Sequence, residues 1–489
     1  MRPRAHEPRR GPMSRATAPP AMTREERLVL GIAVLASFVA FLDGTVVTIA
    51  LPAMERDLGG GLATQQWAVD AYLITLGALI LLAGSLSDAY GRLLVMRIGL
   101  IGFGVTSVAI AAAPSPLVMI IARILQGVAG ALLVPSSLAL IMSTFRDRAA
   151  SARAIGIWTA MTTIALIAGP LMGGLFVDFA SWRYAFLVNV LPIAITLVLI
   201  TRLGHRDVRR AGASIDWLGA ALCTIGLGGA VYALIEQPRL GWGSPLILVT
   251  LAGGILSFAG FLVRQRFARD PMMPFSLFRA RNFWAGNVAT AFVYAALSLN
   301  GFALGVYLQQ GAGLPATLAG LATMPTTIFM IALSARVGTL AGRWGPRLFM
   351  TIGPLLMGLG TLLLLAVTDE FSYWTQVLPS VLVFSLGLTI TVAPLTSAIL
   401  GAIEPERSGI ASAINNAVAR VAGLIVIAML AAVLGGELDL RGFHRAAIVT
   451  AVLMVVGGLV SLVWIENPRG ERADAAASPP PAASAPANS

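Results

Sequence analysis

Long apolar runs of about 20 residues recur along the whole chain, and short polar segments separate them. A helix of that length spans the roughly 30 Å hydrocarbon core of a bilayer. The pattern therefore predicts an all-α polytopic membrane protein. Fourteen transmembrane helices are expected, over residues 28–51, 66–86, 94–113, 117–142, 154–176, 182–202, 215–235, 244–264, 283–307, 316–339, 346–367, 372–400, 409–435 and 444–465.

Arginine is concentrated in every second loop between these runs. The arginine-rich loops lie after the even-numbered spans and hold Arg92, the groups within 146–153, 202–210 and 264–281, and Arg343 with Arg347. The opposite loops are poor in arginine, and in the first of them Glu55 and Asp57 outnumber Arg56. Because basic loops remain on the cytoplasmic side, both chain ends are expected in the cytoplasm.

Composition excludes several other classes of protein. The chain is 57% hydrophobic with a net charge of +11, but its basic residues alternate between two sides rather than forming one stripe, so no nucleic acid is expected as a partner. It contains no lysine, which excludes a phosphate-binding loop of the G-x-x-x-x-G-K-[ST] type. No cluster with the spacing of a metal site or a catalytic group is present, so neither a metal nor an enzymatic activity is expected.

An internal repeat divides the chain. Residues 84–91 and 338–345 both read G-x-L-x-x-x-aromatic-G, and each segment follows the second helix of a six-helix block. Parallel repeats around a central site are typical of transporters. The expected units are a disordered N-terminus (1–26), a six-helix bundle (27–202), a two-helix insert with cytoplasmic loops (203–282), a second six-helix bundle (283–466) and a disordered tail (467–489).

Further motifs lie in order along the predicted spans. They are Leu42-Asp43-x-Thr45-x-Val47 with Ala50-Leu51-Pro52, Gly84-x-Leu86-x-Asp88 with Gly91-Arg92, Arg123-x-x-Gln126-Gly127, Gly169-Pro170-x-x-Gly173-Gly174, Trp182-Arg183 with Asn189, Asp216-Trp217-x-Gly219, and Ser276-Leu277-Phe278-Arg279. Together they resemble the major facilitator superfamily, in its fourteen-span drug:proton antiporter family, over nearly all of residues 28–466. The chain departs from the family pattern at Thr48, Ala89, Leu93 and Ala165.

The resemblance implies a function. Members of this family export amphipathic drugs or antibiotics across the bacterial cytoplasmic membrane by alternating access, and inward proton movement drives the export. We therefore expect protons and a small amphipathic substrate as partners, a monomer in the lipid bilayer, and no cofactor beyond the proton gradient. A proton-coupled metabolite symporter is the alternative within transport, and a membrane sensor or enzyme is the alternative outside it.

Three embedded charges are candidates for proton coupling. Asp43 lies within the first apolar run, where an ionisable group needs a partner, a water-filled cavity or a function. Asp70 and Arg123 lie within the second and fourth runs at depths that place all three in one layer. Two alternatives stay open, namely a static Asp–Arg pair that fixes helix packing and a position of Asp70 at the wet interface.

The same resemblance suggests residues for a substrate cavity and for gating. The cavity candidates are Trp67, Tyr72, Trp158, Met161, Phe292, Phe302, Tyr307, Asn416 and Arg420, although each aromatic side chain alone also fits lipid contact or packing. Arg420, close to the middle of its span, either binds an anionic group of the substrate or pairs within the bundle. The gating candidates are Gly84, Asp88, Gly91 and Arg92 in the loop motif, and Gly169, Pro170, Gly173 and Gly174, which resemble the antiporter motif and also allow close helix packing.

Overall fold

The structure is a computed structural model that describes residues 22–145, 147–203, 215–269, 271–404, 407–434 and 439–467. Within these ranges the regular secondary structure is entirely helical, and fourteen helical spans are long and apolar enough to cross a membrane. The predicted class and number of spans are confirmed, and the protein is a multi-pass membrane protein. An even number of crossings places Arg24 and Trp464 on the same side of the bilayer; that this side is the cytoplasm stays a prediction.

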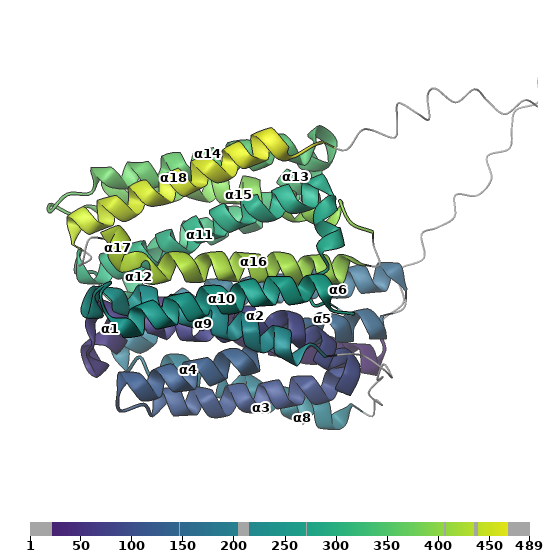
Figure 1. The fold of residues 1–489 in the computed structure, drawn as a ribbon. Coiled ribbons are helices and arrows are strands. Elements are labelled where there is room, and N and C mark those ends of the chain that lie inside the picture. The colour runs from purple at the N-terminus through teal and green to yellow at the C-terminus, as the bar shows by residue number, and fades with distance from the viewer. Residues whose placement is uncertain are drawn as a thin grey trace, which may run out of the picture.

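The spans form two bundles and a two-helix hairpin, and the hairpin lies in front of the level at which the bundles meet in Figure 1. The first bundle consists of α1 (Arg24–Leu58), α2 (Gly61–Tyr90), α3 (Arg92–Ala111), α4 (Pro116–Ala131), α5 (Leu133–Thr144), α6 (Arg148–Phe179), α7 (Tyr184–Leu187) and α8 (Val190–Arg202). The hairpin consists of α9 (Trp217–Leu240) and α10 (Pro245–Phe267). The second bundle consists of η1 (Phe275–Arg279), α11 (Arg281–Gln310), α12 (Ala316–Ala322), α13 (Met324–Trp344), α14 (Pro346–Leu362), η2 (Leu363–Ala366), η3 (Tyr373–Val377), α15 (Leu378–Leu400), α16 (Ser408–Ala428), α17 (Leu430–Leu434) and α18 (Leu440–Trp464).

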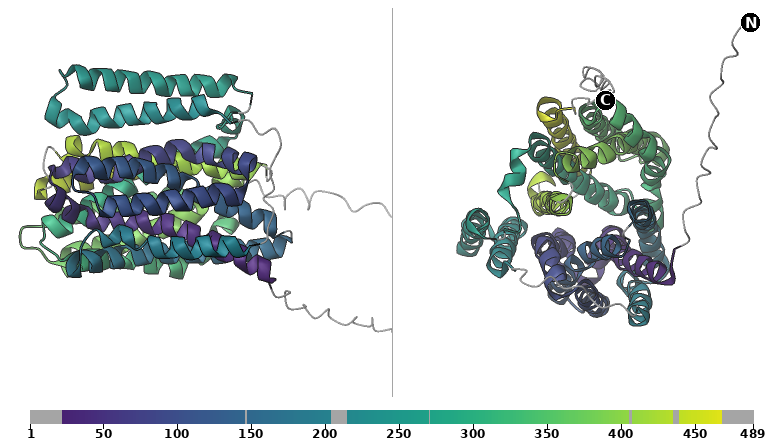
Figure 2. Two further views of the ribbon diagram at one scale, coloured as in Figure 1. Left: turned by 90° about the horizontal axis from the view of Figure 1, so that it is seen from below. Right: turned by 90° about the vertical axis from the view of Figure 1, so that its right-hand side faces the viewer.

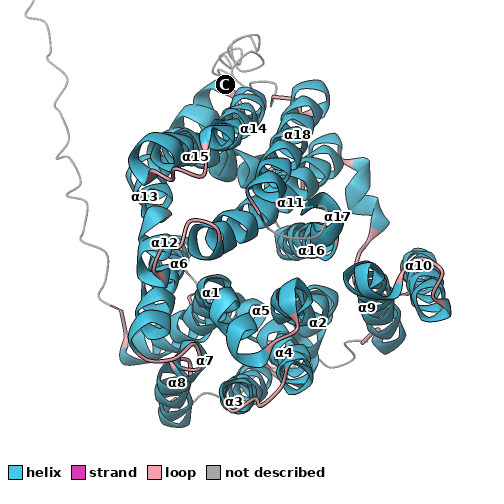
Figure 3. Cartoon of the chain, turned by 90° about the vertical axis from the view of Figure 1, so that its left-hand side faces the viewer, coloured by secondary structure: helices cyan, strands magenta, loops and turns pink. Residues whose placement is uncertain are grey.

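The end-on view shows how these groups are arranged. In Figure 3, α1–α8 occupy one side, α11–α18 occupy the other, and the α9–α10 hairpin lies beside them. The hairpin is also seen along one side of the molecule in Figure 2. Helix α9 packs on α2 and α16, so the insert contacts both bundles, whereas α10 packs mainly on α9. Between the two bundles, α1 contacts α11 and α2 contacts α16.

A polar cluster fastens one end of the hairpin. Asp216, the N-cap of α9, accepts hydrogen bonds from the backbone N–H of Gly219 (2.8 Å), from Gln265 Nε2 (2.9 Å) and from Arg264 Nε of α10. Burial of the Asp216 carboxyl favours its neutral form, but these hydrogen bonds and the charge of Arg264 together lower its pKa below the usual value. The cluster therefore holds the start of α9 against the end of α10.

Two glycines give the internal repeat its geometry. Gly91 (φ 105°) ends α2 and precedes α3, and Gly345 (φ 84°) ends α13 and precedes α14. Positive φ is readily adopted only by glycine, so both turns need this residue. The repeat that was predicted from residues 84–91 and 338–345 is thus reproduced in the backbone.

Several predicted boundaries are wrong. The first helix was expected to start at residue 28 after a disordered segment to 26, but α1 begins at Arg24 because Thr23 and Glu26 form a capping box. It also continues through Pro52 to Leu58, where the side chains of Trp182 and Arg183 donate hydrogen bonds to Asp57. Sequence hydropathy does not detect either end, because both are polar.

The predicted disordered tail also begins too early. Asn467 is ordered, since its side-chain oxygen accepts a hydrogen bond from the backbone N–H of Arg347 at 3.1 Å. The expected disorder of 1–21 and 468–489 lies outside the described residues.

Candidate transport site

A fully buried ion pair joins the first bundle's helices. Asp43 of α1 and Arg123 of α4 are 0% and 1% exposed, and Arg123 Nη1 donates to Asp43 Oδ2 at 2.7 Å. Arg123 Nε also donates to the Ala68 carbonyl of α2 at 2.8 Å. The two charges thus meet in one layer, at the contact of three helices, as their depths in the sequence suggested.

Neutral polar side chains complete this network. Gln126 Nε2 and Asn189 Nδ2 each donate to Asp43 Oδ1 at 3.2 Å, and the Gln126 side-chain oxygen accepts from Arg123 Nη1 at 2.6 Å. Gln126 also donates to Ser107 Oγ at 3.0 Å. Sequence reasoning did not select Gln126 or Asn189 as site residues. A signal was present, because each is an amide within an apolar run and belongs to one of the motifs.

Aromatic rings enclose the guanidinium. The Arg123 Cζ atom lies 4.4 Å from the centre of the Tyr72 ring and 5.7 Å from that of Phe186. Such contacts exclude water and add cation–π attraction. Breaking a buried pair of this kind costs about 3–5 kcal/mol because it leaves one charge uncompensated. The pair is therefore stable unless the helices around it rearrange.

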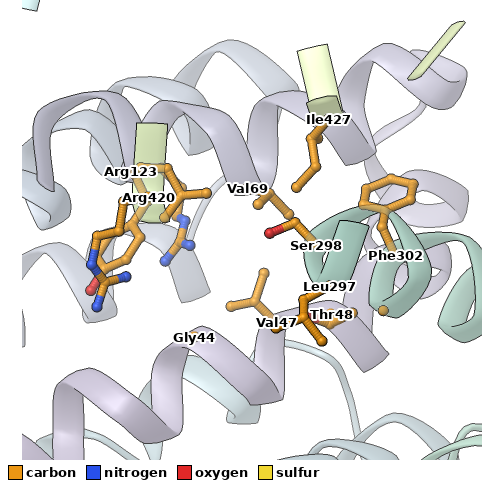
Figure 4. A pocket seen from close by; sticks show the side chains of 13 residues that line it. Gly44, Val47, Thr48, Val69, Arg123, Leu297, Ser298, Phe302, Arg420 and Ile427 are labelled. Atoms are coloured by element: carbon orange, nitrogen blue, oxygen red, sulfur yellow. The ribbon is translucent and has the colours of Figure 1, made fainter. Parts of the chain in front are cut away.

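A cavity of about 270 Å³ lies between the two bundles beside this pair (Figure 4). Its lining comes from α1, α2 and α4 on one side and from α11 and α16 on the other: Gly44, Val47, Thr48, Val69, Tyr72, Leu73, Arg123, Leu297, Ser298, Gly301, Phe302, Arg420 and Ile427. Of the cavity residues predicted from sequence, Tyr72, Phe302 and Arg420 are in this lining.

The other cavity candidates lie outside this lining. Trp67 Nε1 donates to Glu236 of α9 at 3.0 Å, Trp158 Nε1 donates to Ser37 of α1 at 2.9 Å, and Tyr307 stacks on Phe443 at 4.1 Å between ring centres. Phe292 packs beside Gly457 of α18, and the side chains of Met161 and Asn416 are exposed. The four aromatic side chains thus pack on other helices of the protein. A role of these side chains, or of Met161 and Asn416, in contacting the substrate stays a prediction.

Asp70 differs from the other two charged candidates. It is 0% exposed, so it does not lie at the wet interface, and neither of its carboxylate oxygens has a hydrogen-bond partner. It lies on α2 between Trp67 and Ile74, which pack toward α9, and one turn from Gln66, which donates to the Ile427 carbonyl of α16 at 2.6 Å. The structure therefore places Asp70 near the junction of both bundles with the insert, outside the Asp43–Arg123 pair.

The sequence profile of the Major Facilitator Superfamily matches residues 33–427 and 287–487 of this chain. The chain belongs to the major facilitator superfamily. Solved structures agree in fold: a peptide transporter POT in complex with sulfate (TM-score 0.65, 16% identity, 90% of this chain and 94% of that one) and a D-xylose-proton symporter (TM-score 0.65, 15% identity, 90% and 98%). The resemblance seen in the motifs is thus confirmed at the level of the superfamily.

Curated relatives share about one third of their residues with this major facilitator protein. The methylenomycin A resistance protein of Bacillus subtilis is 32% identical over 403 residues, which is 82% of this chain and 86% of the relative. The multidrug resistance protein Stp of Mycobacterium tuberculosis is 33% identical over 422 residues (86% and 78%). The tetracenomycin C resistance and export protein of Streptomyces glaucescens is 34% identical over 411 residues (82% and 74%).

The glycine motif of α6 allows close packing of this helix on two neighbours in this major facilitator protein. A Cβ atom on Gly169 would lie 1.9 Å from Thr45 Oγ1, and one on Gly173 would lie 3.0 Å from the Val46 carbonyl oxygen, both on α1. A Cβ on Gly174 would lie 2.5 Å from the Thr317 Cα of α12, and Gly320 of α12 approaches the Pro170 carbonyl equally closely. The motif therefore allows α6 to pack on α1 within its own bundle and on α12 of the other bundle.

Asp178, one turn beyond this motif, reinforces the contact. Its two carboxylate oxygens accept hydrogen bonds from the backbone N–H groups of Ala316 (2.9 Å) and Thr317 (2.7 Å), the first residues of α12. An acidic side chain at a helix N-terminus satisfies free N–H groups and is favoured by the helix dipole. Sequence reasoning missed Asp178, because its partners come from a segment that is far away in the chain.

The loop motif lies at the opposite end of α2 from the cavity. Asp88 and Arg92 form a loose ion pair of 3.8 Å on either side of Gly91, and a Cβ on Gly84 would meet no atom within 4 Å. Asp88 is separated from Leu73, in the cavity lining, by about 22 Å of helix. These four residues therefore do not contact a molecule in the cavity.

Proposed function

We propose that this protein is a proton-coupled antiporter that exports amphipathic drugs or antibiotics across the bacterial cytoplasmic membrane by alternating access. The observation that carries the proposal is the buried Asp43–Arg123 pair beside a cavity lined by both bundles. The names of the curated relatives, which are resistance and export proteins, support a drug as the cargo.

The geometry suggests how a proton is coupled to the cargo. Protonation of Asp43 removes its charge and leaves the Arg123 guanidinium buried without a counter-ion, at a cost of about 3–5 kcal/mol unless the helices rearrange. Gly44 and Val47, on the same turns of α1 as Asp43, line the cavity together with Arg123. A proton on Asp43 therefore changes the walls of the cavity, and this gives the cargo different affinities in two conformations.

Asp70 supplies a second proton site. An ionised carboxylate without hydrogen bonds is very costly to bury, so Asp70 is the group that holds a proton in this conformation. Its position near the contact of α2 with α9 and α16 links that proton to the fit between the two bundles. In this scheme Asp43 and Asp70 exchange protons in different conformations.

The contact of α6 with α12 favours export over the alternative of a metabolite symporter. In the antiporters that this chain resembles, the glycine motif limits proton leak, and symporters generally lack the motif. Here the motif lies between the bundles with backbone-to-backbone contact, which leaves little room for water. The solved symporter and peptide transporter share the fold, and at 15–16% identity they carry no information on the cargo.

The proposal is tested in two steps. A susceptibility panel in an efflux-deficient bacterial host first identifies an exported compound. Inside-out vesicles with Asp43→Asn should then lose drug-dependent proton release, because the amide keeps the shape but does not exchange a proton. Asp369→Asn, in an exposed loop, is the matched control and should retain it. Exchange at the wild-type rate in Asp43→Asn vesicles would show that Asp43 is not the coupling group.

A further inference from the structure

The cavity between the bundles has an unbalanced positive charge. Its lining contains Arg123 and Arg420 but no aspartate or glutamate. Arg123 is neutralised by Asp43, whose oxygens are also engaged by Gln126 and Asn189. Among the described residues, Arg420 has neither an ion pair nor a hydrogen bond, and its Nε is buried without a partner. A fixed cation without a counter-ion therefore borders the cavity.

Arg420 of α16 faces Gly77 of α2. A Cβ atom built on this glycine would lie 3.7 Å from the Cβ of Arg420, which is an ordinary van der Waals contact between the two helices. Figure 4 shows the guanidinium groups of Arg123 and Arg420 at the same end of the cavity. Because Arg123 is paired with Asp43, the unpaired Arg420 supplies the net charge at that end, which repels a cation and attracts an anion.

The other end of the cavity has a different chemistry. In Figure 4, Phe302, Ile427 and Leu297 lie away from the two arginines, and Ser298 and Thr48 add hydroxyl groups among them. An apolar region of this kind accepts a ring or a short hydrocarbon by area and shape. At about 270 Å³ the cavity suits a small molecule with one polar head and one apolar body.

We propose that the cavity selects small organic anions, whose carboxylate or acidic hydroxyl binds the Arg420 guanidinium and whose apolar body lies against Phe302 and Ile427. The proposal rests on the proposed export function and narrows its cargo from amphipaths of any charge to amphipaths with an acidic head. A guanidinium donates paired hydrogen bonds to a carboxylate, so Arg420 sets both the position and the charge preference of the ligand.

The rival partner of Arg420 is a carboxylate of the protein itself. Asp70 is the buried acid of α2, and it lies seven residues, or about 10 Å along the helix, from Gly77. If the two met in the conformation that binds cargo, Arg420 would be neutralised and the preference for anions would vanish. The test therefore includes a variant of Asp70.

The experiment measures equilibrium binding of three probes of similar shape to the purified full-length protein in lipid nanodiscs. The probes are naphthylacetate, naphthylacetamide and naphthylethylammonium, followed by their fluorescence. The wild type should bind the anion at least about tenfold more tightly than the amide, the size expected of one charge-assisted hydrogen bond, and should bind the cation most weakly. Arg420→Gln should abolish the preference while amide binding is kept. Arg420→Lys should keep part of it, since a point charge remains.

Arg202→Gln, at the end of α8 away from the cavity lining, is the matched control and should leave all three affinities unchanged. Asp70→Asn should also leave the preference unchanged, and a preference that is absent from the wild type but created by this variant would overturn the proposal. Equal affinity for the three probes, binding of none of them, or an unaltered preference in Arg420→Gln would overturn it as well. If proton exchange with a cationic drug depended on Asp43 in the same protein, the proposed export function would stand although the preference for anions had failed. The failure of one proposal can therefore be distinguished from the failure of the other.

Discussion

A single methyl group on Gly174 should separate the two bundles where α6 meets α12. The added Cβ would lie 2.5 Å from the Thr317 Cα and 2.7 Å from its backbone nitrogen, well inside the 3.5–4.0 Å of favourable contact. These are backbone atoms and cannot rotate away, so the helices themselves must move apart by about 1 Å. Overpacking of this kind costs about 1–3 kcal/mol, and the better helix propensity of alanine returns up to about 1 kcal/mol.

A net penalty of about 1–2 kcal/mol, the middle of the resulting range, shifts the equilibrium toward the separated form by about 5- to 30-fold. Gly156→Ala is the matched control on the same helix, because no atom lies within 4 Å of its added Cβ and only the propensity gain remains. Asp178→Ala should act in the same direction as Gly174→Ala, since it removes two hydrogen bonds to the N-terminus of α12, a loss comparable to that of an N-cap side chain, about 0.5–2 kcal/mol.

The assay follows access to the cavity from outside the cell. A cysteine replaces Ser298 of the cavity lining in a Cys223→Ala background, and a membrane-impermeant maleimide is added to intact cells. Gly174→Ala should raise the labelling rate severalfold, and Gly156→Ala should leave it unchanged. Labelling at the wild-type rate in a well-expressed Gly174→Ala protein would refute the view that this contact closes the cavity.

Three further predictions concern topology, gating and pH. In a cysteine-free background, Gly243→Cys should be labelled from outside and Gly342→Cys from inside, since both positions are open and the positive-inside rule puts them on opposite faces; the reverse pattern would contradict the orientation. Asp88→Asn should lower turnover in a transport assay with cargo affinity within a few-fold of wild type, because the loop lies far from the cavity, and a large loss of affinity at normal turnover would count against gating. The pKa of Asp216 is lower in the folded protein than in the unfolded chain, so its ion pair with Arg264 stabilises the fold at any pH above the usual carboxyl pKa of about 4. This stabilisation is lost as the pH falls below about 4 and through the lower pKa of the folded state. The melting temperature in detergent should therefore fall less on acidification for Asp216→Asn than for the wild type. An identical dependence of the melting temperature on pH would show that this carboxyl is not involved.

The sequence by itself determined the class of the protein, the number of spans and the internal repeat. These features are local, because the length of an apolar run and the need for glycine at positions 91 and 345 depend on neighbouring residues alone. It also indicated Asp43 and Arg123, since charges in apolar runs are conspicuous wherever their partners lie.

Only the tertiary structure decided which side chains meet. Tyr72 and Trp67 are aromatic residues of one helix, yet the first borders the cavity and the second packs on α9, because the rotation of α2 is fixed by its neighbours. The cap that Asp178 forms on α12 and the unpaired state of Arg420 depend in the same way on contacts between distant segments. The length of an apolar run does not indicate such contacts, because the lipid and the protein interior are equally apolar and favour the same residues.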